Sequence, residues 1–143
     1  MKILAVDPGD VRIGLAISDE SGRYARPLTT LKHISRPENA ARIARQAEEH
    51  DCQLIIVGTP LDSDGNIGAR ARASLKLVDA IRSVSSIRVE TWDESGSSQQ
   101  ADQLFTEMGV KRKNRAAPKD AQAAALILQD FLDAGTLEND AST

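Results

Sequence analysis

MKILAVDPGDVRIGLAIS, residues 1–18, is the stretch that decides the fold of this 143-residue chain. Residues 2–7 and residues 12–18 are rich in β-branched and apolar side chains, in the pattern of two strands. The intervening PGDV at residues 8–11 is typical of a tight turn, because proline and glycine favour turn conformations. The stretch therefore predicts a β-hairpin that begins a sheet and carries Asp7 at the end of its first strand.

The rest of the chain alternates between strand and helix signals. Ser35 and Glu38 form a capping box that starts a helix, and the continuously apolar run QLIIVG indicates a strand covered on both faces. Pro27 confines the strand that contains it to an edge or a bulge. We expect further strands at 25–31, 53–58 and 87–92, and helices at about 35–50, 67–83, 97–109 and 118–135. This order predicts a mixed α/β sheet with an antiparallel hairpin at one side.

Length and composition indicate one cytoplasmic domain. Hydrophobic residues make up 41% of the chain and charged residues 27%, as in globular proteins. We expect a single domain at 1–136 and a flexible C-terminal tail at 137–143. No segment reaches the roughly 18 apolar residues of a membrane span, and the start does not resemble a signal peptide. Cys52 is the only cysteine, which excludes an internal disulfide, and we interpret it as a buried apolar side chain.

Basic side chains are candidates for local contact with nucleic acid, although the net charge of −3 argues against general electrostatic coating. Arg70, Arg72 and Lys76 fall in one expected helix, where an ordinary solvated face is an equally good interpretation. A second group lies between Gly109 and Pro118 and just beyond, in an expected loop where concentrated charge favours phosphate contact. Its members are Lys111, Arg112, Lys113, Arg115 and Lys119.

Three carboxylates are the candidate catalytic residues. Asp7 ends the first strand, Glu94 follows the last strand, and Asp120 lies in the first turn of the final helix. Taken separately, they are a turn residue, a solvated acid and a partner of the helix dipole. Together they would converge at one sheet edge and hold Mg²⁺ or Mn²⁺, which prefer oxygen ligands. Two such ions about 4 Å apart can promote phosphodiester hydrolysis.

Zinc would prefer His or Cys ligands, and the chain has only two histidines. Neither His33 nor His50 has a second soft ligand near it in sequence. We interpret both as surface residues.

Four motifs then identify a resemblance that covers nearly the whole chain. They are DPGDVRIGLA at 7–16, GTPLDSDG at 58–65, DESGSSQQA at 93–101 and KDAQAAALILQ at 119–129. Their order and spacing resemble those of the YqgF family, whose members are similar to Holliday junction resolvases of the ribonuclease-H-like superfamily. The resemblance implies a five-stranded sheet of order 3-2-1-4-5 with strand 2 antiparallel. It also places the acidic positions of the family on Asp7, Glu94 and Asp120.

The function that this resemblance implies is that of a metal-dependent nuclease maturing the 5′ end of pre-16S rRNA, with two Mg²⁺ or Mn²⁺ ions. The partners implied are pre-rRNA or branched DNA and the ribosome, with no membrane. Junction resolution is an alternative that would need a two-fold dimer, and the sequence leaves a monomer or a weak homodimer open. A nucleotide-binding role like that of actin and sugar kinases is disfavoured, since those proteins bind nucleotide between two such domains.

One motif departs from the family pattern. The family usually has an arginine directly after the Asp-Glu pair, where this chain has Ser95. A guanidinium there would suit phosphate binding, so its loss leaves a catalytically weak RNA-binding assembly factor as a third alternative. We hypothesise that Arg12 or the basic loop replaces it.

Overall fold

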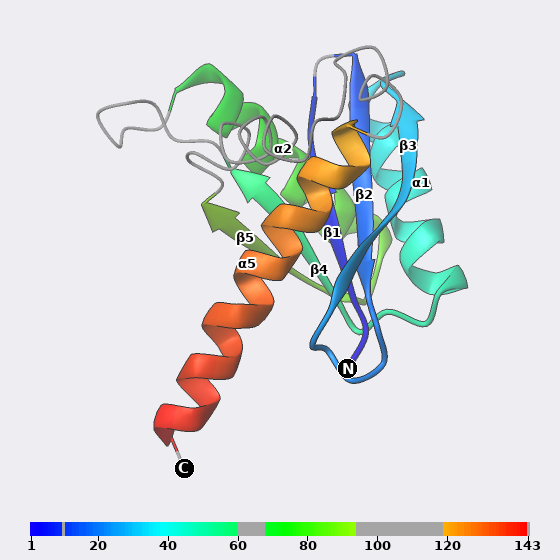
Figure 1. Cartoon of the computed structure of the whole chain (residues 1–143). Helices are drawn as coiled ribbons and strands as arrows, with labels where there is room; N and C mark the ends of the chain where they lie inside the picture. Colours follow the sequence, from blue (N-terminus) through cyan, green and yellow to red (C-terminus); the bar gives the residue numbers. More distant parts are fainter. Residues whose placement is uncertain (10, 60–67, 94–118, 143) are drawn as a thin grey trace.

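The computed structural model describes residues 1–9, 11–59, 68–93 and 119–142. Its elements are β1 (Ile3–Asp7), β2 (Arg12–Ser18), β3 (Ala25–Lys32), α1 (Arg36–Glu49), β4 (Leu54–Thr59), α2 (Ala69–Val84), β5 (Arg88–Asp93) and α5 (Lys119–Ser142). The five strands form one sheet of order β3-β2-β1-β4-β5. β2 is antiparallel to both of its neighbours, and β1, β4 and β5 are parallel. The predicted strand order and the antiparallel hairpin are confirmed (Figure 1).

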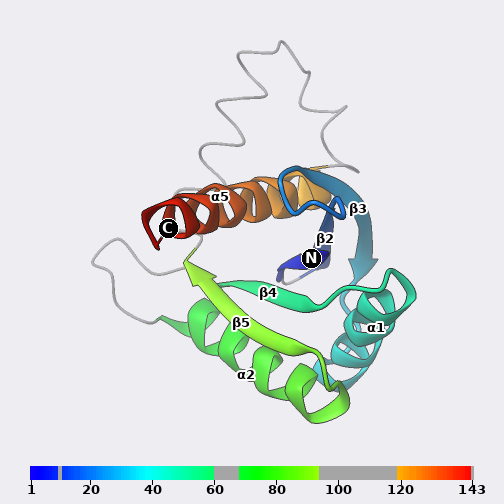
Figure 2. The same cartoon turned by 90° about the horizontal axis from the view of Figure 1, so that it is seen from below.

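Helices cover both faces of the sheet. Figure 2 shows α1 and α2 on one face and α5 on the other. The pleat of β1 sends alternate side chains to opposite faces, so Leu4 and Val6 belong to the core under α1 and α2. Ile3 and Ala5 belong to the core under α5. We call these two sides the α1/α2 face and the α5 face.

Several local predictions are confirmed. Ser35 caps α1, since its side chain accepts a hydrogen bond of 3.3 Å from the backbone N–H of Glu38. β3 is an edge strand, and its register against β2 shifts where Pro27 pairs with Ala16. Proline has no N–H to donate, which is why it occurs at such an irregularity. Cys52 is buried, as expected.

The predicted end of the last helix is wrong. The sequence predicts that Gly135 terminates this helix, yet α5 continues to Ser142. Glycine disfavours a helix by only about 1 kcal/mol, so a long helix can pass through one. The helix expected at 97–109 lies outside the described residues. No helix in the described part of the chain is long and apolar enough to cross a membrane.

Candidate active site at the carboxyl edge of the sheet

Several backbone termini meet at one edge of the sheet. The three parallel strands β1, β4 and β5 all end there, and α2 and α5 begin there (Figure 1). Ligand sites of α/β proteins occur at the carboxyl ends of parallel strands. Asp7 is the last residue of β1 and is half-buried at this edge. Since Ile3 and Ala5 lie under α5, the strand alternation directs Asp7 to the α5 face as well.

Gly14 brings Asp120 to the same position. Gly14 is the cross-strand partner of Asp7 in the β1–β2 pair, and directly opposed residues project to the same face. A Cβ atom on Gly14 would collide with the backbone carbonyl of Asp120 and would lie 3.0 Å from the backbone nitrogen of Ala121. The first turn of α5 therefore rests directly on β2 beside Asp7, which is possible only because residue 14 has no side chain.

Asp120 begins the row of α5 side chains that packs on the sheet. Ala124 and Ile127 in that row are buried, and Phe131 packs against the same core. Asp120 itself is half-buried. A carboxylate on the packed face of a helix needs a polar partner, which the helix dipole alone does not supply. The structure thus brings two of the three predicted acids, Asp7 and Asp120, to one place.

The third predicted acid, Glu94, lies outside the described residues. The preceding strand, β5, is described up to Asp93. Its side chains alternate between the two faces of the sheet, and this alternation shows which face Asp93 occupies. Val89 belongs to the core under α1 and α2, whereas Trp92 packs with the core under α5. Asp93 follows the Val89 series and projects to the face opposite Asp7. Within the described part of the chain no group of three or more His, Cys, Asp or Glu side chains could hold a metal ion.

The residues at the edge fit a divalent cation in their chemistry. Asp7 and Asp120 offer carboxylate oxygens, the ligands that Mg²⁺ and Mn²⁺ prefer. The close approach at Gly14 places the backbone of Asp120 beside the strand position opposite Asp7.

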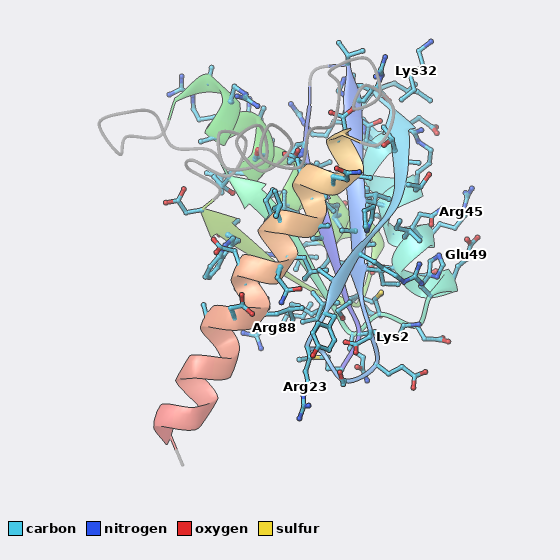
Figure 3. All side chains as sticks on the ribbon, viewed as in Figure 1. Lys2, Arg23, Lys32, Arg45, Glu49 and Arg88 are labelled. Carbon is cyan, nitrogen blue, oxygen red and sulfur yellow. The ribbon has the colours of Figure 1, made fainter. Side chains whose placement is uncertain are left out.

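Basic side chains surround this edge. Arg12 is exposed at the start of β2, on the same face as Gly14 and Ala16. Its cross-strand partner is Lys32, which is also exposed and which Figure 3 shows at the same end of the sheet. Sequence reasoning missed Lys32, because only the register of β2 with β3 reveals that it opposes Arg12.

The other predicted nucleic-acid contacts are only partly described. Arg70 and Arg72 lie exposed in the first turn of α2, at the same edge as Asp7. Lys119 begins α5, but its side chain is outside the described part of the structure. The remaining basic candidates of the second group lie outside it entirely: Lys111, Arg112, Lys113 and Arg115.

Comparison with known proteins finds relatives that match nearly the whole chain. Residues 1–134 match the family model RuvX, described as Holliday junction resolvase. A Chloroflexus aggregans protein named "Putative pre-16S rRNA nuclease" is 43% identical over 133 residues, covering 92% of this chain and 93% of that protein. A Myxococcus xanthus protein of the same name is 37% identical, with coverages of 94% and 89%.

Solved structures share the fold at low sequence identity. RuvC of T. thermophilus in complex with a Holliday junction substrate matches with a TM-score of 0.58 at 19% identity, covering 95% of this chain and 96% of that one. The fowlpox virus Holliday junction resolvase matches with a TM-score of 0.58 at 12% identity, covering 94% and 99%. These similarities confirm the expected ribonuclease-H-like fold.

Proposed function

The chain belongs to the RuvX Holliday junction resolvase family and is a nuclease, and we propose that it cuts nucleic-acid phosphodiesters with divalent cations held by Asp7, Glu94 and Asp120. The observation that carries this proposal is the contact of Gly14 with the backbone of Asp120 beside Asp7. Bound Mg²⁺ or Mn²⁺ would supply Lewis-acid stabilisation of the phosphate and would lower the pKa of an attacking water.

Glu94 is proposed as the third ligand in preference to Asp93. Asp93 belongs to the same alternating series as Val89 and therefore projects to the face opposite Asp7. The variant Glu94→Gln should therefore lose cleavage, whereas Asp93→Asn should keep it. The opposite result would assign the third ligand to Asp93.

From the family resemblance we propose cleavage at a 5′ end, in the cytoplasm and during ribosome assembly, and as the substrate we choose pre-16S rRNA. This choice rests on the names of relatives that are 37–43% identical over nearly the whole chain. Four-way junction DNA is the second candidate, favoured by the description of the family model. The two candidates share the same chemistry at the acids and differ in the shape of the nucleic acid.

The test compares the wild-type chain with Asp7→Asn and Asp120→Asn on a pre-16S rRNA fragment and on a four-way junction, with Mg²⁺, with Mn²⁺ or with EDTA. Both variants should lose cleavage while their thermal unfolding stays cooperative. Asp130→Asn is the matched control, because Asp130 is exposed on the same helix. Cleavage that survives in Asp7→Asn would refute the proposed centre. Nucleic-acid binding without any wild-type cleavage would instead favour the assembly-factor alternative.

A further inference from the structure

A cavity of about 190 Å³ opens on the α1/α2 face, between the β1–β2 turn and the beginnings of α1 and α2. Pro8 and Gly9 of the turn form one wall, and Arg36 and Arg70 lie on the helices opposite. Its floor includes Leu77, which belongs to the core under α1 and α2. Asp7 and Asp120 face the other side of the sheet. The cavity, here called the α1–α2 pocket, is therefore separate from the acidic site, although both lie at the same sheet edge.

The charged groups of the α1–α2 pocket are cationic. Arg36 and Arg70 are both exposed, and no acidic side chain is among the described residues that line the cavity. The ion pairs found in the described part of the chain involve other arginines, Arg82 and Arg88. Among its described lining residues, the pocket thus holds two guanidinium groups and no carboxylate to balance them.

The position of Arg70 at the beginning of α2 is unfavourable without an anion. Arg36 is the first residue of α1, whose first turn also contains Glu38 and whose N-cap Ser35 accepts a hydrogen bond from the Glu38 backbone N–H. Arg70 lies in the first turn of α2, which contains no acidic residue and whose N-cap, Gly68, provides no side-chain hydrogen bond. The beginning of a helix carries partial positive charge, so cations there are disfavoured and anions are favoured. An anion between the two helices would interact favourably with the beginning of α2 and with both guanidinium groups.

A buried amide orients a further hydrogen-bond donor in the pocket wall. Asn39 is only 2% exposed, and its Oδ1 accepts hydrogen bonds from the Ile34 backbone N–H at 3.1 Å and from Arg42 Nη2 at 2.6 Å. Its Nδ2 is thereby left to donate to Nδ1 of His33, 3.0 Å away. Because Nδ1 accepts, a neutral His33 ring carries its proton on Nε2 and can donate to a ligand.

We propose that the α1–α2 pocket binds a phosphate group of the nucleic-acid substrate, away from the bond that is cut, through Arg36, Arg70 and His33. This inference rests on the proposed nuclease function. Whole-ligand pockets usually begin at roughly 300 Å³, so the smaller cavity suits a phosphate group better than a complete nucleotide. Arginine is the side chain best suited to phosphate because its guanidinium can donate two parallel hydrogen bonds.

The test is a double variant, Arg36→Ala with Arg70→Ala, in the full chain. The matched control, Arg45→Ala with Arg23→Ala, removes the same net charge from exposed positions away from the pocket (Figure 3). Binding of a 5′-hydroxyl single-stranded RNA oligonucleotide is measured against salt concentration in EDTA, so that no cleavage occurs. For the pocket variant we expect weaker binding and a log–log salt slope reduced by about 0.7 for each phosphate that the variant no longer neutralises. The control should keep the wild-type slope.

A second arm uses inorganic phosphate at constant ionic strength, followed by NMR of the His33 ring and of the Arg36 and Arg70 amides. Phosphate should shift these resonances in the wild type and not in the pocket variant. Equal oligonucleotide binding by the pocket variant and the control would overturn the proposal. If inorganic phosphate moved the resonances but the 5′-hydroxyl oligonucleotide did not, the pocket would be a free-phosphate site and the proposal would again fail. Both arms measure binding and not cleavage. A failure of this proposal can therefore be distinguished from a failure of the proposed nuclease centre in the Asp7→Asn test.

Discussion

Gly14 is the residue on which the position of Asp120 depends. A methyl group at Gly14 would overlap the Asp120 carbonyl, so the first turn of α5 would have to move off β2. We predict that Gly14→Ala lowers the free energy of unfolding by about 1–3 kcal/mol, the usual cost of overpacking, and severely reduces cleavage. Gly68→Ala is the control, because nothing lies within 4 Å of its added Cβ. Wild-type cleavage and stability in Gly14→Ala would contradict this account of the site.

Asp19 organises the turn between β2 and β3 through its carboxylate. Hydrogen bonds from Ser21 Oγ at 2.6 Å and from the backbone N–H groups of Tyr24 and Arg23 lower the pKa of Asp19 to about 2. Since the folded-state pKa lies below the unfolded value of 3.8, the stabilisation is complete above pH 3.8 and is lost as the pH falls through about 2.

The prediction for Asp19 is that its carboxyl titrates in the folded protein with a midpoint near 2, which NMR can follow. Asp19→Asn should lower the melting temperature at pH 6. The difference in melting temperature from the wild type should disappear as the pH falls through about 2, where the wild-type carboxyl becomes protonated. If the Asp19 carboxyl titrated at its ordinary pKa and Asp19→Asn melted at the wild-type temperature at pH 6, the Asp19 charge would not stabilise the turn.

Individual elements could be predicted well from the sequence wherever the local signal was strong. The capping box at Ser35 and Glu38 fixed the start of α1, and the continuous apolar run of β4 indicated a strand covered on both sides. The end of α5 could not be predicted, because one glycine is a weak signal against the propensity of a long helix. Lys32 was missed for a different reason: its role depends on pairing between strands, which no local pattern encodes.

The β2–β3 pair presents Arg12 and Lys32 side by side near the acids. Like charges directly across a strand pair repel each other, so bound phosphate would relieve their repulsion. We predict that Arg12→Ala and Lys32→Ala each weaken nucleic-acid binding and reduce the salt slope by about 0.7 to 0.9. Arg23→Ala, at the opposite end of the sheet in Figure 3, should bind like the wild type. Unchanged binding in Arg12→Ala would remove that residue from the site.

At the scale of the whole molecule, the topology explains why residues distant in sequence share one edge. The family resemblance predicted the strand order and supported the choice of Asp7 and Asp120, and the register of β1 with β2 supplies the physical reason for their proximity. The α1–α2 pocket could not be predicted, because it exists only where α1 packs beside α2. Arg70 was a candidate from the sequence, but Arg36 and His33 become meaningful only through that packing.

Cys52 reports on the integrity of the whole fold. It is 5% exposed in the core under α1 and α2, and desolvation by burial raises the pKa of its thiol above the ordinary 9.0. We predict that the native protein reacts with a thiol reagent at pH 8 far more slowly than the protein in urea, because reaction needs an opening that exposes the thiolate. Equally fast reaction in both conditions would show that this core opens readily.

The central claim is that Asp7, Asp120 and Glu94 together hold divalent cations. The most direct measurement is the anomalous scattering of crystals soaked in Mn²⁺, from the wild type and from Asp7→Asn. The account predicts strong anomalous density between Asp7 and Asp120 that also contacts Glu94, and its loss in the variant. Density elsewhere, or none at this edge while a nucleic-acid substrate is still cut, would contradict it.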